Sequence, residues 1–229
     1  MGKGGLPIST KPYYGFFQRI TRDGMVDMEM IKTPACFSTK YPIIDVEIKN
    51  ESLDAQGRFD PRRGEICIVG FFIDDKITQF MLKDESKIEE FGQAVNDFLG
   101  TMNGKKAYAF NVNMEEGCFT ELLGHSPRIY EIKPFRGRGA TKEYFFKYLV
   151  KKKIETPDSI CFKDPLDGRS KLCAEYWQKG RFEDVRKHNL CCLTKEAKIL
   201  EHRYFIVKEF SPLIDRNDWL KPNATLPPV

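Results

Sequence analysis

Two carboxylates lie two residues apart in the most apolar stretch of the chain. The segment reads Tyr41-Pro-Ile-Ile-Asp45-Val-Glu47-Ile-Lys49, a pattern that predicts a β-strand. Successive side chains of a strand alternate between its faces, so Asp45 and Glu47 project from the same face. Two buried carboxylates repel each other and lose hydration, which is unfavourable unless a cation neutralises them. The pair therefore indicates a metal site, and the alternative is an exposed edge strand whose charges face water.

The elements that must position this pair follow it along the chain. Four further strands are predicted at 65–73, 77–82, 106–110 and 129–132, with Asp74-Asp75 as the turn between the first two. Helices are predicted at 86–100, opened by a Ser86–Glu89 capping box, and at 115–123, 141–150, 171–178 and 182–202. This order predicts an α/β fold with a mixed sheet of about five strands flanked by helices. We expect an N-terminal extension over residues 1–40, one domain over 41–204 and a C-terminal tail over 205–229.

Three motifs in this order resemble the DEDD-type 3′–5′ exonucleases of the ribonuclease H-like superfamily. Ile43-Ile-Asp45-Val-Glu47 is similar to the first motif of that family, an apolar strand that bears Asp-x-Glu. Tyr108-Ala-Phe-Asn111-Val-Asn-Met-Glu115 is similar to the second, in which the third carboxylate stands at a helix start. The helix that carries His188 and Cys192 resembles the third motif, where a Tyr or His precedes an aspartate by one turn.

The resemblance implies a ribonuclease H-like sheet and hydrolysis of DNA or RNA, expected to be single-stranded. In the family, two Mg²⁺ or Mn²⁺ ions about 3.5–4 Å apart activate a water and stabilise the leaving oxygen of a phosphodiester. By this resemblance the metal ligands are Asp45, Glu47, Glu115 and the residue at position 192. His188 takes the place of the residue that orients or deprotonates the water, and Asn111 is expected to contact the substrate.

The chain departs from the family pattern at three positions. Glu115 replaces an aspartate and is one methylene longer, while Cys192 stands where the fourth carboxylate is expected and is a softer ligand, better suited to zinc. Lys49 follows on the strand face of Asp45 and could pair with the carboxylates in place of a metal. Glu196, one helical turn beyond Cys192, could supply the missing carboxylate. Each departure weakens the expected two-ion site.

Two other kinds of chemistry are open to the last helix. His188, Cys191 and Cys192 together could bind zinc, but a second ligand pair is lacking and adjacent cysteines on a helix point apart. Cys192 could instead act as a nucleophile with His188 one turn before it, although no oxyanion hole is indicated. The sequence favours neither alternative over the carboxylate site.

Basic residues are concentrated between Ile132 and Lys153. This block holds eight Lys or Arg residues against the single Glu143, while the whole chain has a net charge of only +4. A basic block with interleaved aromatic rings is typical of a phosphate-binding surface, and the alternative is a solvated helix face. The block predicts nucleic-acid contact by residues of this segment, in particular Arg136, Arg138, Lys142 and Lys151.

The bulk composition is that of an ordinary globular protein. Hydrophobic residues make up 41% and charged residues 31% of the 229 residues, and no apolar run is long enough to span a bilayer. The seven cysteines include no C-x-x-C pair, which predicts free thiols and a reducing, cytoplasmic environment. We expect no membrane partner; a protein partner remains open.

Two functions are compatible with these residues. The first is metal-dependent 3′–5′ exonuclease-type processing of nucleic acid by Asp45, Glu47 and Glu115. The second is a catalytically degraded ribonuclease H-like domain that binds nucleic acid or a protein without cutting. The order of the motifs favours the first, whereas Cys192 and Lys49 favour the second.

Overall fold

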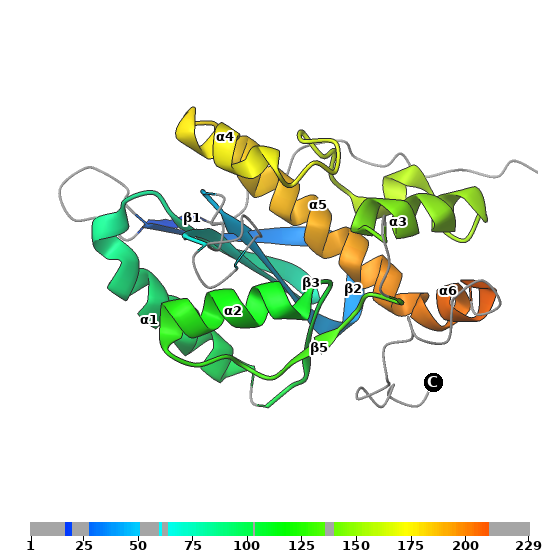
Figure 1. Cartoon of the computed structure of the whole chain (residues 1–229), viewed down its shortest axis with the longest axis horizontal. Coiled ribbons are helices and arrows are strands. Elements are labelled where there is room, and N and C mark those ends of the chain that lie inside the picture. Colours follow the sequence, from blue (N-terminus) through cyan, green and yellow to red (C-terminus); the bar gives the residue numbers. More distant parts are fainter. Residues whose placement is uncertain are drawn as a thin grey trace, which may run out of the picture.

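A mixed β-sheet between two layers of helices forms the body of the molecule (Figure 1). The computed structural model describes residues 17–19, 28–50, 60, 64–102, 104–135 and 140–210. Its strands are β1 Phe17–Arg19, β2 Met28–Ile48, β3 Ile66–Leu82, β4 Ala107–Ala109 and β5 Ile129–Glu131. Its α-helices are α1 Ile88–Thr101, α2 Val112–Leu123, α3 Lys142–Lys151, α4 Leu172–Gln178, α5 Phe182–Glu201 and α6 Arg203–Phe210, with 3₁₀ turns η2 Glu85–Lys87 and η3 Pro157–Ile160.

The strand β2 is the centre of the sheet. It pairs antiparallel with β3 along one edge, and on its other edge it pairs antiparallel with β1 and, further along, parallel with β4 through Ile43 and Tyr108. β5 extends the sheet by pairing parallel with β4. At the level of Asp45 the order is therefore β3-β2-β4-β5. The predicted α/β class, with a mixed sheet flanked by helices, is confirmed.

The predicted number of strands and the predicted hairpin are wrong. The segments 65–73 and 77–82 are not two strands joined by a turn but one strand, β3, which runs through Asp74 and Asp75. Both halves of β3 pair with β2, as Val69 with Val46 and Leu82 with Met28. Asp74 has a φ of 54°, which is typical of a turn. Here it produces only a local irregularity where the two long strands pair. The five strands predicted from the sequence are thus four, and the short β1 lies outside that set.

The predicted domain boundaries also fall inside elements of the structure. Residues 28–40 belong to β2, so the boundary at residue 41 divides a strand that is continuous. The expected tail begins inside α6, which continues to Phe210, and the chain beyond that point lies outside the described residues. The Ser86–Glu89 capping box is likewise not formed, because Asp84 accepts the hydrogen bond from the Ser86 backbone N–H instead.

Hydrophobic side chains project from both faces of β2 and pack against helices on either side. Ile44 and Val46 belong to a core shared with Phe91 of α1 and Phe119 of α2. Ile43, on the other face, belongs to a core shared with α3 and α5, and a third cluster joins the sheet to α4 around Trp177. Asp45 and Glu47 therefore lie on the face that α3, α4 and α5 cover.

Two of the cysteines are joined. Cys36 of β2 and Cys161, which follows η3, form a disulfide with a Cα–Cα distance of 5.8 Å. The prediction that the cysteines are all free is wrong for this pair, while Cys67, Cys118, Cys173, Cys191 and Cys192 are free and buried. Among the described residues, no helix combines the length and the apolar character needed to cross a membrane.

Candidate metal centre

The first two candidate ligands lie side by side on β2, as the spacing predicts. Asp45 and Glu47 are 2% and 4% exposed and face α5. Lys49 does not join them: its ammonium pairs with Glu65 at 3.1 Å and with Glu85. The pairing register shifts between Glu47 and Ile48, where β3 has one extra residue, Cys67. Lys49 therefore leaves the carboxylate face unblocked.

A close approach of α5 to the sheet brings the ligands of the helix to those of the strand. Gly70 of β3 pairs with Asp45, and a Cβ at this glycine would lie 2.2 Å from Asn189 Oδ1 and 2.8 Å from Leu193 Cδ1. The Asn189 amide donates to Asp45 Oδ2 at 2.7 Å and to the Asp45 carbonyl at 3.2 Å. Gln79 in turn donates to Asn189 Oδ1 at 2.7 Å. The missing side chain at position 70 thus allows α5 to hold Asp45 in place.

One half of the centre is acidic and surrounds a lysine; we call Asp45, Glu115, Glu196 and Lys142 the acidic half. The Lys142 ammonium, from the first turn of α3, lies 2.6 Å from Asp45 Oδ1 and 2.9 Å from Glu196 Oε1. Glu196 is fully buried, and Glu115 of α2 is 2% exposed. Burial raises the pKa of Glu115 well above its usual range, and the negative charge of Asp45 raises it further. Two of these carboxylates therefore share one ammonium group, whose charge also acts on Glu115.

The acidic half has more negative charge than its lysine can balance. Within the described part of the chain, Glu115 Oε2 and Glu196 Oε2 are buried without a hydrogen-bond partner, an arrangement that is unfavourable unless a proton or a cation satisfies it. Burial raises the pKa of Glu196 well above normal, with Lys142 opposing and Asp45 adding to the shift. Burial by itself lowers the pKa of Lys142, but the charges around it, Asp45 foremost, raise it well above its ordinary value. Hard oxygen ligands with unmet charge fit Mg²⁺ or Mn²⁺.

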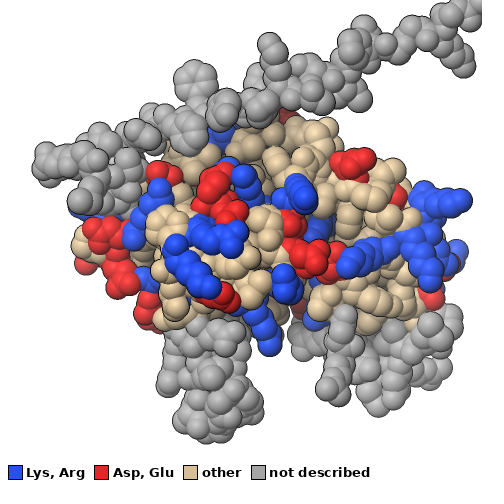
Figure 2. All heavy atoms as spheres, turned by 90° about the horizontal axis from the view of Figure 1, so that it is seen from above, with Lys and Arg blue, Asp and Glu red and all other residues tan. Residues whose placement is uncertain are grey.

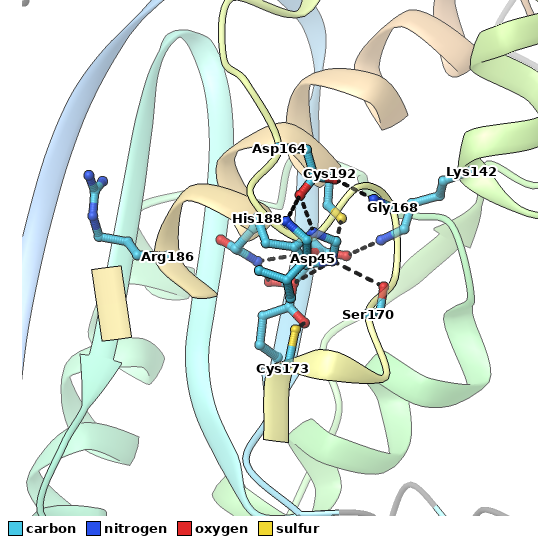
Figure 3. A network of polar contacts seen from close by, with 12 residues as sticks. Asp45, Lys142, Asp164, Gly168, Ser170, Cys173, Arg186, His188 and Cys192 are labelled. Atoms are coloured by element: carbon cyan, nitrogen blue, oxygen red, sulfur yellow. Dashed lines mark hydrogen bonds and ion pairs between the residues drawn. The ribbon is translucent and has the colours of Figure 1, made fainter. Parts of the chain in front are cut away.

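The other half of the centre contains sulfur and imidazole ligands; we call Glu47, Cys173, His188 and Cys192 the thiol half (Figure 3). The Cys173 thiol of α4 donates to Glu47 Oε2 at 3.1 Å. His188 Nε2 lies 3.5 Å from Cys192 Sγ and 4.0 Å from Glu47 Oε1. Glu47, Cys173 and His188 each offer a ligand atom within 4.8 Å of the other two, as do Asp45, Glu47 and Cys192. Both groups can hold a metal ion.

Hydrogen-bonding groups fix the ring of His188 at both of its nitrogens. Its Nδ1 lies 2.8 Å from Asp164 Oδ1, and its Nε2 lies 3.1 Å from the Ser170 hydroxyl. Burial by itself lowers the pKa of His188, but Cys192, Glu47 and Asp164 together raise it to about 11. For the Glu47 carboxyl, burial acts in the opposite direction: it raises the pKa to about 7, and repulsion from Asp45 adds to this shift. A buried imidazolium held in this way is a poor general base.

The residues predicted to bind nucleic acid are placed apart from one another. Lys142 turns inward into the acidic half rather than outward to a ligand. Lys151 is exposed near the end of α3, and Asn111 is exposed directly before α2, where its side chain makes no capping hydrogen bond. Arg136 and Arg138 lie outside the described residues. The predicted basic surface is therefore represented in the described structure by exposed lysines of α3 and the turn after it.

The face seen in Figure 2 carries both signs of charge. Acidic and basic side chains alternate over most of it, and basic side chains are denser at the end where α3 and α6 lie in Figure 1. Two lysines here are paired, Lys147 of α3 with Glu143 at 3.3 Å and Lys152, directly after α3, with Glu209 at 3.0 Å. The cleft beside α3 includes Glu143, Asp158, Asp164 and Asp167 against three lysines, so its lining does not favour phosphate.

Four residues of the centre were missed or given too little weight from sequence. The basic block predicts Lys142 at the surface, and the helical spacing predicts Glu196 only as a substitute for the carboxylate expected at position 192. Cys173 and Asp164 were not identified, because no spacing links them to β2: Cys173 lies 126 residues from Glu47. The i,i+4 spacing of His188, Cys192 and Glu196 on one helix does predict from the sequence that these three side chains lie along one face.

Comparison of the chain with family models, with curated proteins and with solved structures gives no match. The candidate centre is therefore interpreted from its own geometry and chemistry.

Proposed function

We propose that the chain is a ribonuclease H-like domain that processes nucleic acid. The strand order β3-β2-β4-β5, with one antiparallel and two parallel pairings, is compatible with such a sheet. The carboxylates stand on the central strand, at the helix start after β4 and on the long helix α5. These are the elements on which the exonuclease resemblance predicts metal ligands. The proposal of a ribonuclease H-like fold rests on this agreement between the predicted and the observed positions of the carboxylates.

The proposed reaction is metal-dependent hydrolysis of phosphodiesters, of the 3′–5′ exonuclease type. The observation that carries it is the burial of Asp45 and Glu196 against one ammonium group, whose charge also acts on the buried Glu115. Two carboxylate oxygens, one of Glu115 and one of Glu196, are left without a hydrogen-bond partner in the described chain. Such buried carboxylates are unfavourable as charged groups unless a proton or a cation joins them, and a divalent ion would favour their charged form. These three carboxylates would hold Mg²⁺ or Mn²⁺.

A bound divalent ion supplies a nucleophilic water at neutral pH and stabilises charge on phosphoryl oxygens. Asp45 and Glu196 would orient that ion, and Asn189 would keep the Asp45 carboxylate in position through its amide hydrogen bond. Lys142 would place a positive charge beside the phosphoryl group, since its side chain is 21% exposed and marks the side of the acidic half that solvent reaches. His188 is not assigned the role of general base, because it is fully buried and its pKa is raised to about 11.

The test is a nuclease assay on 5′-labelled single-stranded DNA and RNA with Mn²⁺ or Mg²⁺. We expect a ladder that shortens from the 3′ end with the native chain, and at least a hundredfold slower cleavage with Asp45→Asn or Glu115→Gln, since each removes charge from the ion site. Glu116→Gln, the neighbouring change outside the acidic half, is the matched control. Equal cleavage by all four proteins would assign the activity to a contaminant or to another site.

A second candidate is a non-catalytic domain that binds nucleic acid or a protein. The observation that favours it is Lys142, which already forms two short ion pairs inside the centre. If this candidate is right, the native chain shows no metal-dependent cleavage, and Asp45→Asn leaves its binding to single-stranded DNA or RNA unchanged. Binding measured by fluorescence anisotropy at several salt concentrations distinguishes the two candidates, because phosphate contacts give a steep salt dependence.

A further inference from the structure

We infer that the thiol half is a separate, closed binding site for a zinc-class ion, held by Glu47, Cys173, His188 and Cys192. This inference does not rest on the proposed nuclease function. Thiolate and imidazole are the ligands that Zn²⁺ prefers, whereas Mg²⁺ and Mn²⁺ prefer oxygen. The two halves of the centre thus differ in the class of ion that they suit.

The separations of the candidate ligand atoms match a single coordination sphere. Bond lengths of about 2.0–2.3 Å to zinc place neighbouring ligand atoms of a tetrahedral site roughly 3.4–3.7 Å apart. Cys173 Sγ and Glu47 Oε2 are 3.1 Å apart, Cys192 Sγ and His188 Nε2 are 3.5 Å apart, and His188 Nε2 and Glu47 Oε1 are 4.0 Å apart. Glu47, Cys173 and His188 also offer ligand atoms that all lie within 4.8 Å of one another, and Cys192 adjoins this group through His188. Both oxygens of Glu47 face this half.

The surroundings of His188 are those of a metal-bound imidazole. Asp164 accepts the hydrogen bond from Nδ1, which leaves Nε2 directed at the thiols and at Glu47. A carboxylate in this position fixes the ring and its tautomer at many zinc sites. Asp164 is itself held, since it accepts the backbone N–H groups of Leu166 and Gly168, each at 2.9 Å. The Ser170 hydroxyl, 3.1 Å from Nε2, would give up that contact to the ion.

Burial indicates that the ion would be structural. The four candidate ligands are between 0% and 4% exposed, so no coordination position is open to a substrate or to bulk water. Closed sites with protein ligands at every position are typical of structural zinc. The ion would join β2, α4 and α5, which supply one, one and two of the ligands. In this arrangement Cys192 is not a failed replacement for a carboxylate but the ligand that sets the preference of the site.

The test is cobalt binding by the full-length chain, freed of metal with a chelator in the presence of a mild reductant. Co²⁺ is the probe, because thiolate ligation gives a charge-transfer band in the near ultraviolet and tetrahedral ligation gives intense visible bands. We expect both signals at one equivalent, and displacement of Co²⁺ by one equivalent of Zn²⁺ but not by Mg²⁺. Binding of Co²⁺ without a thiolate band would overturn the inference.

The ligands are assigned with single variants. Cys173→Ser and Cys192→Ser should each reduce the thiolate band and weaken Zn²⁺ binding at least tenfold, and Asp164→Asn should weaken it about 10–100-fold while the band is kept. The matched control is Cys191→Ser, because Cys191 is equally buried but donates to the Phe162 carbonyl outside the site. Asp164→Asn is the readout if a cysteine variant does not fold. Unchanged affinity in the folded variants would exclude the site, and none of these signals depends on nuclease activity.

Discussion

At the scale of single residues, Lys142 decides the character of the acidic half. Its ammonium lies between Asp45 and Glu196, and Asp45 is one of the metal ligands that the exonuclease resemblance predicts. An ammonium group donates hydrogen bonds and neutralises one negative charge. It therefore compensates three buried carboxylates only in part. The same residue is therefore consistent with an active site that also uses a lysine and with a site in which the lysine has replaced the ion.

Replacement of this lysine separates the two interpretations. Lys142→Met should lower the free energy of unfolding by about 3 kcal/mol without divalent ions, near the lower end of the range for a broken buried pair because the lysine is partly exposed. Millimolar Mn²⁺ should restore part of that loss if the carboxylates hold an ion. Urea denaturation with and without Mn²⁺ measures both effects.

The matched control for that variant is Lys147→Met on the same helix. Lys147 makes an i,i+4 pair with Glu143 and its side chain is 72% exposed, so we expect a change below about 0.5 kcal/mol and no response to Mn²⁺. An Mn²⁺ response of the same size in both variants would place the ion elsewhere. No response in either would favour the non-catalytic domain.

At the scale of elements, the contact between β3 and α5 sets the distance between the strand ligands and the helix ligands. Gly70→Ala would push its Cβ to 2.2 Å from Asn189 Oδ1, so α5 would have to move. We expect a loss of about 1–3 kcal/mol in stability, typical of overpacking, together with weaker metal binding in both halves of the centre. Thermal unfolding and cobalt titration of the variant measure the two effects.

A glycine of α1 provides the control for this substitution. Gly100 lies within the helix and has no atom within 4 Å of a Cβ built on it. Gly100→Ala should therefore stabilise the protein by about 0.5–1 kcal/mol, since alanine is the better helix former, and should leave metal binding as it is. If Gly70→Ala were as stable as the native chain, α5 would not be held against β3 at this point.

At the scale of the whole molecule, the Cys36–Cys161 disulfide links β2 to the segment that leads into Asp164. The two cysteines are 125 residues apart, and closing so long a loop restricts the unfolded chain strongly. Cys36→Ser should cost about 2–5 kcal/mol of stability in oxidising buffer. Reductant should lower the stability of the native chain to the same level and leave the variant unaffected, and denaturation in both buffers checks this. A native chain indifferent to reductant would show that the bond does not form in solution.

The sequence by itself determined which residues were available for chemistry and on which kinds of element they would lie. Asp45 and Glu47 share a strand face because alternation in a strand is a local property, and the helices around Glu115 and His188 follow from local hydrophobic periodicity. The mixed α/β character follows from the order of these local elements. The long continuous strand β3 was missed because a turn signal at Asp74-Asp75 was overridden by pairing with a distant strand.

Only the tertiary structure decided which of these residues meet. Lys142 turns inward and Lys49 turns away because of ion pairs with residues far along the chain. Cys173 and Asp164 join Glu47 and His188 through the packing of α4 and of the loop before it, which no local spacing encodes. Glu196, rather than Cys192, completes the carboxylate set because α5 is held close to β3 over Gly70. Long-range packing, which fixes the distances between elements, separates an acidic half from a thiol half in one buried centre.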